Sequence, residues 1–409
     1  MNLVVIGAQW GDEGKGKVVD YLSEGADVTL RFSGGANAGH TIVRGDKVYK
    51  LHLVPSGIVT PDKTVVLGSG MVIDPEALFA ELHELTNQGL LWEGRVLVSD
   101  RAHVVLPGYR KLDVELDQER AEPIGTTGRG IGIAYSRKAM RDGLRIIDIL
   151  EQEIFETIEP SDREFLEQYR EPLADMIIDV QRYMELKGSK TVLLEGAQGA
   201  LLDLDLGTYP YVSSGCSAAA GASLGSGIGP RAIDRVIGVF KAYSTRVGNG
   251  PFPTEFLRDR DGRLIEHIRE VGNEYGVTTG RPRRCGYLDL VALRYICRSN
   301  SIDSLALTHL DVYDEMDEVR LCVAYDIGQA SVDTFPASRT ALDKAQPVTK
   351  KFPGWKQSLS AITAFSALPQ PARDYIAFIE RYTGVPVDII SVGPDREQTI
   401  VRRDPWTQS

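Results

Sequence analysis

Short apolar runs recur along the chain and alternate with longer segments in which apolar residues return every three or four positions. Runs that are apolar throughout are typical of strands buried on both faces of a parallel sheet, and the longer pattern is typical of amphipathic helices. The predicted strands are Leu3–Gly7, Val28–Phe32, Thr64–Leu67, Arg95–Val98, Thr191–Leu194, Arg235–Phe240, Ser304–Leu307 and Val387–Ser391. The predicted helices are Lys17–Ser23, Pro75–Leu85, Arg163–Leu186, Gly286–Arg298 and Pro371–Tyr382. Their alternation predicts an α/β fold with a mainly parallel central sheet flanked by helices, and it leaves the strand order open.

Two segments interrupt this alternation. Residues 107–148 contain few strand signals and predict a mostly helical insertion. Ser213–Gly229 is rich in serine, alanine and glycine and predicts a loop with a tightly packed helix. No internal repeat, heptad run or low-complexity linker marks a boundary. We therefore expect residues 1–409 to form one large domain that carries helical and loop subdomain insertions.

Composition and charge narrow the class of protein. The chain is 43% hydrophobic and 25% charged with a net charge of −11, and no apolar stretch approaches the ~20 residues that span a bilayer. Nucleic acids and anionic membranes bind basic surfaces, so neither is an expected partner. The 4 cysteines show no Cys-x-x-Cys spacing and no signal peptide is evident, so we expect reduced thiols and a cytoplasmic location.

A glycine-rich turn follows the first predicted strand and leads into the first predicted helix. It reads Gly11-Asp12-Glu13-Gly14-Lys15-Gly16-Lys17-Val18. Glycines let backbone N–H groups approach an anion, and a helix N-terminus adds a favourable dipole, so the turn predicts a P-loop-like phosphate site. Val18 stands where a P-loop has the Ser or Thr that binds metal, which leaves Asp12 as the nearby oxygen ligand for Mg²⁺. A plain connecting turn is the alternative, but it would not need two lysines and an acidic pair.

A second loop of small residues follows the second predicted strand and ends in Asn37-Ala38-Gly39-His40-Thr41. Loops at the carboxyl ends of neighbouring parallel strands face the same site, so this loop is expected to reach the phosphates held by the first. A single histidine is more often structural than catalytic, but His40 lies among small and hydroxyl residues. His40 is therefore a candidate catalytic residue, whereas His52 and His103 lie in apolar runs and are expected to be structural.

Motifs spread over the whole chain resemble those of the adenylosuccinate synthetase family. They are Gln-Trp-Gly-Asp-Glu-Gly-Lys-Gly-Lys at 9–17, Gly-Gly-Ala-Asn-Ala-Gly-His-Thr at 34–41, Ile-Gly-Thr-Thr-Gly-Arg-Gly-Ile-Gly at 124–132, Glu-Gly-Ala-Gln-Gly at 195–199, Gly-Thr-Tyr-Pro-Tyr-Val at 207–212, Gly-Pro-Phe-Pro-Thr-Glu at 250–255, Thr-Thr-Gly-Arg-Pro-Arg-Arg at 278–284 and Ser-Val-Gly-Pro-Asp-Arg at 391–396. Several motifs in the order that the family shows are far more specific than any one of them.

The resemblance implies a GTP-dependent ligase that joins IMP to L-aspartate and gives adenylosuccinate, GDP and phosphate. Asp12 would take the N1 proton of IMP and ligate Mg²⁺, His40 would stabilise the transferring phosphoryl group and act as an acid, and Gln198 would lie near the reacting O6. The γ-phosphoryl group placed on O6 makes a leaving group that the aspartate amine displaces. This chemistry needs positioning and charge neutralisation rather than a protein nucleophile.

The resemblance also implies a set of residues for each ligand. GTP would contact Gly11, Asp12, Glu13, Gly14, Lys15, Gly16, Lys17, Gly39, His40, Thr41, Arg283, His309, Leu310, Asp311, Ser391, Val392 and Gly393. IMP would contact Asp12, Glu13, Gly14, Lys15, Asn37, Ala38, Gly39, His40, Thr127, Arg141, Gln198, Ser213 and Arg281. L-Aspartate would contact Val277, Thr278, Thr279, Gly280, Arg281, Pro282 and Arg283. Mg²⁺ would be held by Asp12 and the carbonyl of Gly39, and Arg141 would reach the partner's site in a homodimer.

Two departures from the family pattern keep alternatives open. His309 replaces the lysine of Thr-Lys-Leu-Asp at the guanine site, and Ser213 replaces a threonine near the IMP phosphate. A paralogue that acts on another purine nucleotide, such as dGMP, is one alternative, although its family usually lacks the aspartate that this chain retains as Asp12. A GTP-binding switch without ligase chemistry would not need this combination of residues. A small-molecule kinase would not need aspartate as a substrate.

Overall fold

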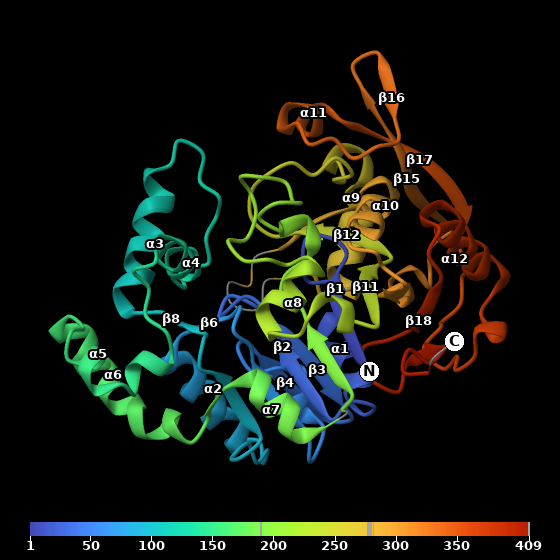
Figure 1. The fold of residues 1–409 in the computed structure, drawn as a ribbon. Coiled ribbons are helices and arrows are strands. Elements are labelled where there is room, and N and C mark those ends of the chain that lie inside the picture. Colours follow the sequence, from blue (N-terminus) through green and yellow to red (C-terminus); the bar gives the residue numbers. More distant parts are fainter. Residues whose placement is uncertain (189, 276–279, 281, 408–409) are drawn as a thin grey trace.

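A computed structural model describes residues 1–188, 190–275, 280 and 282–407, and its centre is one ten-stranded sheet (Figure 1). From edge to edge the strands are β19 (Thr399–Val401), β18 (Val387–Ser391), β14 (Ser304–Thr308), β11 (Arg235–Lys241), β1 (Asn2–Gly7), β10 (Val192–Glu195), β2 (Val28–Arg31), β5 (Thr64–Leu67), β7 (Val96–Ser99) and β9 (Ile177–Ile178). Neighbouring strands are parallel except for β18 and β19. The predicted α/β fold with a mainly parallel sheet is confirmed.

All eight predicted strands are present and occupy consecutive places in the sheet, from β18 to β7. β1 shows why the pattern identifies them. Leu3 and Val5 pack in one core cluster, whereas Val4 and Ile6 pack in another on the opposite face of the strand. A strand buried on both faces is apolar at every position, and this is the signal in the sequence. The two strands of this sheet that the pattern missed, β9 and β19, lie at its edges and have 2 and 3 residues.

Helices complete the core on both faces of the sheet. Val18, Val19 and Leu22 of α1 (Lys15–Ser23) share a cluster with Leu3 and Val5. Each such buried aliphatic side chain contributes about 1.5–3 kcal/mol to folding relative to leaving it exposed. The cluster of Val4 and Ile6 includes residues of α8 (Ala220–Ser226), α10 (Leu290–Ser299) and α12 (Gln370–Thr383). The helices predicted at Lys17–Ser23, Pro75–Leu85 and Pro371–Tyr382 are confirmed as α1, α2 (Pro75–Asn87) and α12.

The helix predicted over Arg163–Leu186 is wrong, because that segment contains two helices and a strand. α6 (Pro160–Ala174) ends before β9, and α7 (Val180–Lys187) begins after Asp179. The Asp179 carboxylate accepts a hydrogen bond from the backbone N–H of Arg182 at 3.1 Å and so caps the second helix. Between them, the isoleucines of β9 pair with β7, and this tertiary pairing overrides the helical periodicity of the sequence.

The helix predicted over Gly286–Arg298 is wrong at its start. Residues Arg284–Asp289 form strand β13, and α10 begins only at Leu290. The Asp289 carboxylate accepts a hydrogen bond from the backbone N–H of Ala292 at 3.0 Å, which sets the first turn of the helix. β13 is held by antiparallel pairing with β12 (Tyr243–Arg246) and by parallel pairing with β15 (Glu318–Ile327).

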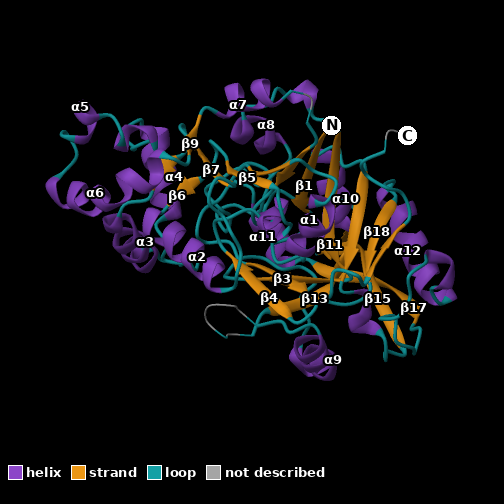
Figure 2. Ribbon diagram, turned by 90° about the horizontal axis from the view of Figure 1, so that it is seen from below, coloured by secondary structure: helices purple, strands orange, loops and turns teal. Residues whose placement is uncertain are grey.

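Smaller elements extend the sheet at its two ends. Figures 1 and 2 both show a helical arm at one end and the second sheet with its hairpin at the other. The arm contains α3 (Pro107–Glu119) and α4 (Ile131–Met140), which lie within residues 107–148, followed by α5 (Gln152–Phe155) and α6. The second sheet contains β12, β13, β15, β16 (Ala330–Val332) and β17 (Gln346–Pro353). Two small ribbons, β3 (His40–Arg44) with β4 (Lys47–Leu51) and β6 (Val72–Ile73) with β8 (His103–Val104), and helices α9 (Arg258–Val271) and α11 (Arg339–Lys344) complete the fold.

Ser213–Gly229 contains α8 within a loop, as the composition predicted. The packing is so close that a Cβ at Gly225 would overlap the carbonyl oxygen of Phe32. None of the helices in the described part of the chain has the length and apolar composition of a membrane span.

Candidate active site

Most of the candidate residues lie at the carboxyl ends of neighbouring parallel strands, which all face the same edge of the sheet. In strand order they are Ser391–Gly393 at β18, His309–Asp311 after β14, Gly11–Lys17 after β1, Gln198 after β10 and Asn37–His40 after β2. The phosphate loop therefore lies between the residues predicted for the guanine base and those predicted for IMP. This order brings together five segments that are far apart in the sequence.

The phosphate loop reaches its shape through left-handed backbone conformations. Gly11, Asp12 and Gly14 have φ angles of 88°, 57° and 79°, and Gly14 is the residue from which α1 starts. Glycine adopts such angles freely, but Asp12 carries a Cβ and is strained there by about 1–2 kcal/mol. Strain of this kind persists where the surrounding structure enforces it, and it is concentrated at functional sites.

Glu13 holds the loop from within. Its fully buried carboxylate accepts hydrogen bonds from the backbone N–H groups of Gln9 at 3.1 Å and Gly11 at 2.9 Å. The same carboxylate pairs with Lys15 Nζ at 2.6 Å. A Cβ at Gly7 would overlap the carboxylate, so the strand has to end in glycine for the turn to close. Glu13 and Lys15 thus stabilise the loop itself in this structure.

Val18, which occupies the P-loop position of Ser or Thr, is 2% exposed and packs in the core under α1. It points away from the phosphate loop, which fits the expectation that another residue supplies the metal ligand.

Lys17 joins α1 to the far end of the chain. Its Nζ donates hydrogen bonds to Ser391 Oγ at 2.7 Å and to the carbonyls of Gly393 at 2.7 Å and Gln398 at 3.0 Å. Burial lowers the pKa of Lys17 to about 8, although nearby carboxylates oppose the shift. Lys17 therefore fixes the segment that is predicted to complete the guanine site.

His40 is oriented by a buried carboxylate. Its Nδ1 lies 2.7 Å from Glu195 Oε1 and 3.1 Å from Ser56 Oγ. Glu195 also accepts hydrogen bonds from the N–H and the hydroxyl of Ser56, each at 2.8 Å. Burial raises the pKa of Glu195, but the contacts with His40 and other donors outweigh it and lower the pKa below its ordinary value. An ionised Glu195 keeps the Nδ1 proton in place and leaves Nε2 as the ring nitrogen available to a ligand.

Arg31 at the end of β2 fixes the second loop. The guanidinium is buried and donates to the carbonyls of Ser33 at 3.2 Å, Gly35 at 2.9 Å and His52. His52 Nδ1 in turn donates to the carbonyl of Ala38 at 2.7 Å, which is the structural role expected for this histidine. The loop that carries His40 is thus held from both sides.

Apart from the phosphate loop and the His40 loop, the described residues predicted to contact IMP lie in three parts of the structure. Gln198 has a φ angle of 54° and donates through Nε2 to Asn37 Oδ1 at 3.3 Å, so these two side chains are brought together. The Ser213 hydroxyl is buried and has no hydrogen-bond partner among the described residues. Thr127 lies exposed in the loop between α3 and α4, and Arg141 lies exposed at the end of α4 with a φ angle of 69°.

The residues predicted for the guanine base lie beside β14. His309 has a φ angle of 55°, and its Nδ1 lies 3.3 Å from the hydroxyl of Tyr243. Burial lowers the pKa of His309 to about 3, and nearby cations such as Lys241 add to the shift, so the imidazole is neutral at pH 7. Burial raises the pKa of Asp311, which is half-buried on the short helix that follows.

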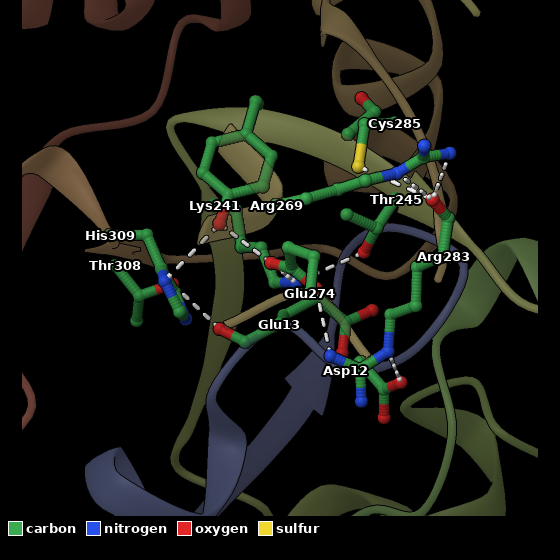
Figure 3. A network of polar contacts seen from close by, with 12 residues as sticks. Asp12, Glu13, Lys241, Thr245, Arg269, Glu274, Arg283, Cys285, Thr308 and His309 are labelled. Carbon is green, nitrogen blue, oxygen red and sulfur yellow. Dashed lines mark hydrogen bonds and ion pairs between the residues drawn. The ribbon is translucent and has the colours of Figure 1, made fainter. Parts of the chain in front are cut away.

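Asp12 takes part in a line of alternating charges (Figure 3). Its carboxylate lies 2.9 Å from Arg283 Nε, and Arg283 Nη1 lies 2.8 Å from Glu274 Oε2. Glu274 Oε1 accepts from Lys241 Nζ at 2.5 Å and from the Tyr243 hydroxyl at 2.6 Å. Asp12 is the outermost of these charges, with 30% of its side chain exposed, and is the one that a ligand can reach.

The predicted aspartate loop is described in part. Gly280 is exposed with a φ angle of 63°, and Pro282 forms an antiparallel bridge with Tyr275. Four residues predicted to contact ligands lie outside the described residues, namely Val277, Thr278, Thr279 and Arg281.

A family model described as adenylosuccinate synthetase matches residues 4–400. The chain belongs to the adenylosuccinate synthetase family. An adenylosuccinate synthetase of Synechococcus sp. (strain RCC307) is 47% identical over 429 aligned residues, which cover 99% of this chain and 97% of the relative. The adenylosuccinate synthetase of Desulforamulus reducens is also 47% identical, over 427 residues that cover 98% of this chain and 99% of the relative.

Solved structures agree with the family. Fully ligated adenylosuccinate synthetase from Plasmodium falciparum matches with a TM-score of 0.90 and 39% identity, over 98% of this chain and 99% of that chain. A cyanophage S-2L succinoaminodeoxyadenylate synthetase bound to dGMP and dATP matches with a TM-score of 0.65 and 22% identity, over 98% and 95% of the two chains, and so shares the fold. Members of the adenylosuccinate synthetase family are ligases that join IMP to L-aspartate with hydrolysis of GTP, and this member is an enzyme of that type.

Two carboxylates that contact candidate residues were not singled out by the sequence. Glu195 orients His40, and Glu274 holds Arg283. The sequence does contain a signal for Glu195, because this charged residue comes at the end of an apolar run. A charged residue at the end of a buried strand requires a partner that compensates its charge. Glu274 follows a helix in a polar segment, and nothing in its local sequence distinguishes it from a surface residue.

Proposed function

We propose that the ligation proceeds through a 6-phosphoryl-IMP intermediate formed at Asp12. The observation that carries this is the place of Asp12, on the loop between the predicted guanine residues and the Gln198–Asn37 pair. A nucleotide phosphate lying on this loop would end beside a purine ring held by that pair. The arrangement supplies the proximity that phosphoryl transfer requires.

The proposed reaction can be followed bond by bond. Asp12 accepts the N1 proton of IMP, so that electron density moves to O6, which attacks the γ-phosphorus of GTP and releases GDP. The uncharged amine of L-aspartate then attacks C6, and the C6–O6 bond breaks so that phosphate leaves with the original O6. The proton that the nitrogen gives up passes to the departing phosphate or to water. The protein contributes positioning and charge, and no covalent enzyme intermediate forms.

His40 would stabilise the transferred phosphoryl group. Its Nδ1 is engaged by Glu195, so Nε2 is the ring nitrogen left to contact a phosphoryl oxygen. Glu195 and Ser56 are positioning residues in this scheme, because they act on the ligand only through His40.

Mg²⁺ would be held by Asp12 and the Gly39 carbonyl, together with phosphate oxygens and water. Gly39 is exposed, and the space that its Cβ would occupy is open, so a ligand can approach its backbone. No cluster of three or more metal-binding side chains occurs among the described residues. A small number of protein ligands is what Mg²⁺ normally has, because it prefers hard oxygens, keeps several waters and binds mainly through substrate phosphates. When bound, the ion would neutralise phosphate charge during transfer.

We further propose a homodimer in which Arg141 serves the partner's IMP phosphate. Arg141 is exposed on the helical arm, which Figure 1 shows to one side of the central sheet. The Ser213 hydroxyl, which has no hydrogen-bond partner among the described residues, would complete the binding of the IMP phosphate together with Thr127. Arg283 and the residues around Gly280 would bind the carboxylates of L-aspartate.

A substrate panel tests the proposed function against the alternatives. Initial rates would be measured with IMP against dGMP, GTP against ATP, and L-aspartate against close analogues, by the ultraviolet change of the purine and by phosphate release. We expect product only with IMP, GTP, L-aspartate and Mg²⁺ together. Turnover with dGMP but not IMP would assign a different purine, and nucleotide hydrolysis that does not need aspartate would indicate a kinase or a switch.

The shifted pKa of Lys17 predicts how GTP use depends on pH. Because burial lowers this pKa to about 8, the cation is present below that pH and is lost above it. Above pH 8, kcat/KM for GTP is expected to fall up to about tenfold for each pH unit. In Lys17→Arg the cation persists, so kcat/KM for GTP, whatever its value, should stay level across the same range. An equal fall in the arginine variant would show that another group is responsible.

A further inference from the structure

Glu274 uses both of its carboxylate oxygens, and each one serves a different part of the site. Oε2 accepts from Arg283 Nη1 at 2.8 Å, and Oε1 accepts from Lys241 Nζ at 2.5 Å and from the Tyr243 hydroxyl at 2.6 Å (Figure 3). The Glu274 side chain is fully buried, and Lys241 is 1% exposed. The buried carboxylate thus contacts two cations and a hydroxyl, and its proposed role does not require contact with a substrate.

On the Oε2 side, Glu274 fastens the base of the predicted aspartate loop. Its carbonyl accepts a hydrogen bond from the backbone N–H of Arg283 at 2.9 Å, in addition to the bond between the two side chains. Tyr275 and Pro282 form the next antiparallel bridge into the loop. The guanidinium of Arg283, gripped in this way, presents Nε to Asp12 at 2.9 Å. Glu274 thus contacts Arg283 through both its backbone and its side chain, and it sets where the Arg283 guanidinium points.

On the Oε1 side, the contacts lead to the predicted guanine site. The Tyr243 hydroxyl that donates to Glu274 also lies 3.3 Å from His309 Nδ1, and the two rings meet edge to face at 5.8 Å between centroids. Because the hydroxyl proton is given to the carboxylate, the hydroxyl oxygen is left to accept from Nδ1–H. Glu274 therefore selects the tautomer and the orientation of His309 through one intervening group.

Fold stability alone does not explain this arrangement. Taking a carboxylate and an ammonium out of water is costly, and apolar residues of similar volume often stabilise a core as well or better. Here the charges continue outward to Asp12, where the chain of contacts reaches the exposed part of the site. A buried ion pair that ends on a reactive group is better explained by what it positions.

We propose that Glu274 is a positioning residue that links the nucleotide-base site to Arg283, which is a predicted contact of L-aspartate. Directly it sets the Arg283 guanidinium beside Asp12, and through Tyr243 it sets His309. The inference rests on the proposed function, since the two ends of the link are the predicted binding sites for GTP and L-aspartate. IMP meets this path only at Asp12, and its other predicted partners, Asn37 and Gln198, lie on the opposite side of the phosphate loop.

The test is a comparison of KM values in Glu274→Gln, Tyr243→Phe and a matched control. Glutamine keeps the shape of the side chain but weakens the contacts with both cations, so KM for GTP and KM for L-aspartate should each rise about tenfold. KM for IMP should change by less than about twofold. Tyr243→Phe keeps every charge and the contact between Glu274 and Arg283, and it removes the hydroxyl that joins Glu274 to His309. It should therefore raise KM for GTP and change KM for L-aspartate by less than about twofold.

Glu255→Gln is the matched control, because Glu255 pairs with Arg284, the neighbour of Arg283, at 2.5 Å. It should leave all three KM values within about twofold of the wild type. If the KM values for all three substrates rose equally in Glu274→Gln, or if Glu255→Gln raised them as much, Glu274 would have only a structural role. Should Glu274→Gln fail to fold, the selective effect of Tyr243→Phe still decides the matter: a KM for GTP unchanged in that variant would overturn the link. Wild-type turnover in the same assay tests the proposed function separately.

Discussion

Replacing Asp12 with asparagine is expected to lower kcat by about 10³-fold or more. Asparagine is nearly the same size, so the strained turn is preserved, but it cannot accept the N1 proton and is a weaker ligand for Mg²⁺. Without proton removal, O6 stays a carbonyl oxygen and a poor nucleophile. The pairing of Asp12 with Arg283 would also be lost, which frees the guanidinium but leaves no base beside it. Steady-state rates with saturating IMP, GTP and L-aspartate measure the effect.

The Asp12 prediction separates catalysis from binding. GTP affinity of Asp12→Asn, measured by calorimetry, should remain within about tenfold of wild type, because the backbone of the phosphate loop is intact. Asp179→Asn provides a control, since its carboxylate caps α7 away from the site, and its kcat should stay within about twofold. Near-normal turnover by Asp12→Asn would rule out the general-base role.

Replacing His40 with alanine is expected to lower kcat by about 10²–10³-fold, the usual effect of removing one donor to a transition-state oxyanion. KM for the substrates should change far less, because the contact strengthens only during phosphoryl transfer. Glu195→Gln should lower kcat less, by about tenfold to a hundredfold. The His40 ring remains in this variant, but its Nδ1 contact is weakened and its tautomer is no longer fixed.

The separation of kcat from KM distinguishes positioning from mere structural support at His40. Since Glu195 acts by orienting the ring, Glu195→Gln should lower kcat while KM for GTP and KM for IMP stay within about twofold of the wild type. Ser56→Ala removes one donor to Glu195 and the longer contact with Nδ1 but keeps the contact between Glu195 and Nδ1, so it should lower kcat less than Glu195→Gln does. A Glu195→Gln variant with wild-type kcat would show that the orientation of His40 does not limit the reaction.

The strands of the central sheet could be predicted because each of them is buried on both faces. Val4 and Val5 illustrate this, as they enter opposite core clusters and are both apolar. The error over residues 163–186 has a physical cause: Ile177 and Ile178 fit a helical face equally well, and only pairing with β7 decides their conformation. Edge strands this short carry no periodicity of their own.

The site could be predicted as segments but not as an arrangement. The phosphate loop and the His40 loop are local features with their own signals, whereas strand order depends on contacts across the whole chain. That order places β1 between β11 and β10. Asp12 therefore lies between the residues predicted to bind guanine and those predicted to bind IMP. The partners of Glu195 and Glu274 could not be predicted for the same reason, since distant segments supply them.

The most direct test of the account follows the oxygen at position 6 of IMP. The enzyme would be given IMP labelled with ¹⁸O at C6, together with GTP, L-aspartate and Mg²⁺, and the phosphate released would be examined by mass spectrometry. Activation of O6 by the γ-phosphoryl group predicts that one ¹⁸O atom appears in every phosphate formed and that none remains in the purine product. Unlabelled phosphate, with the label in water or in the purine, would contradict the phosphorylated intermediate.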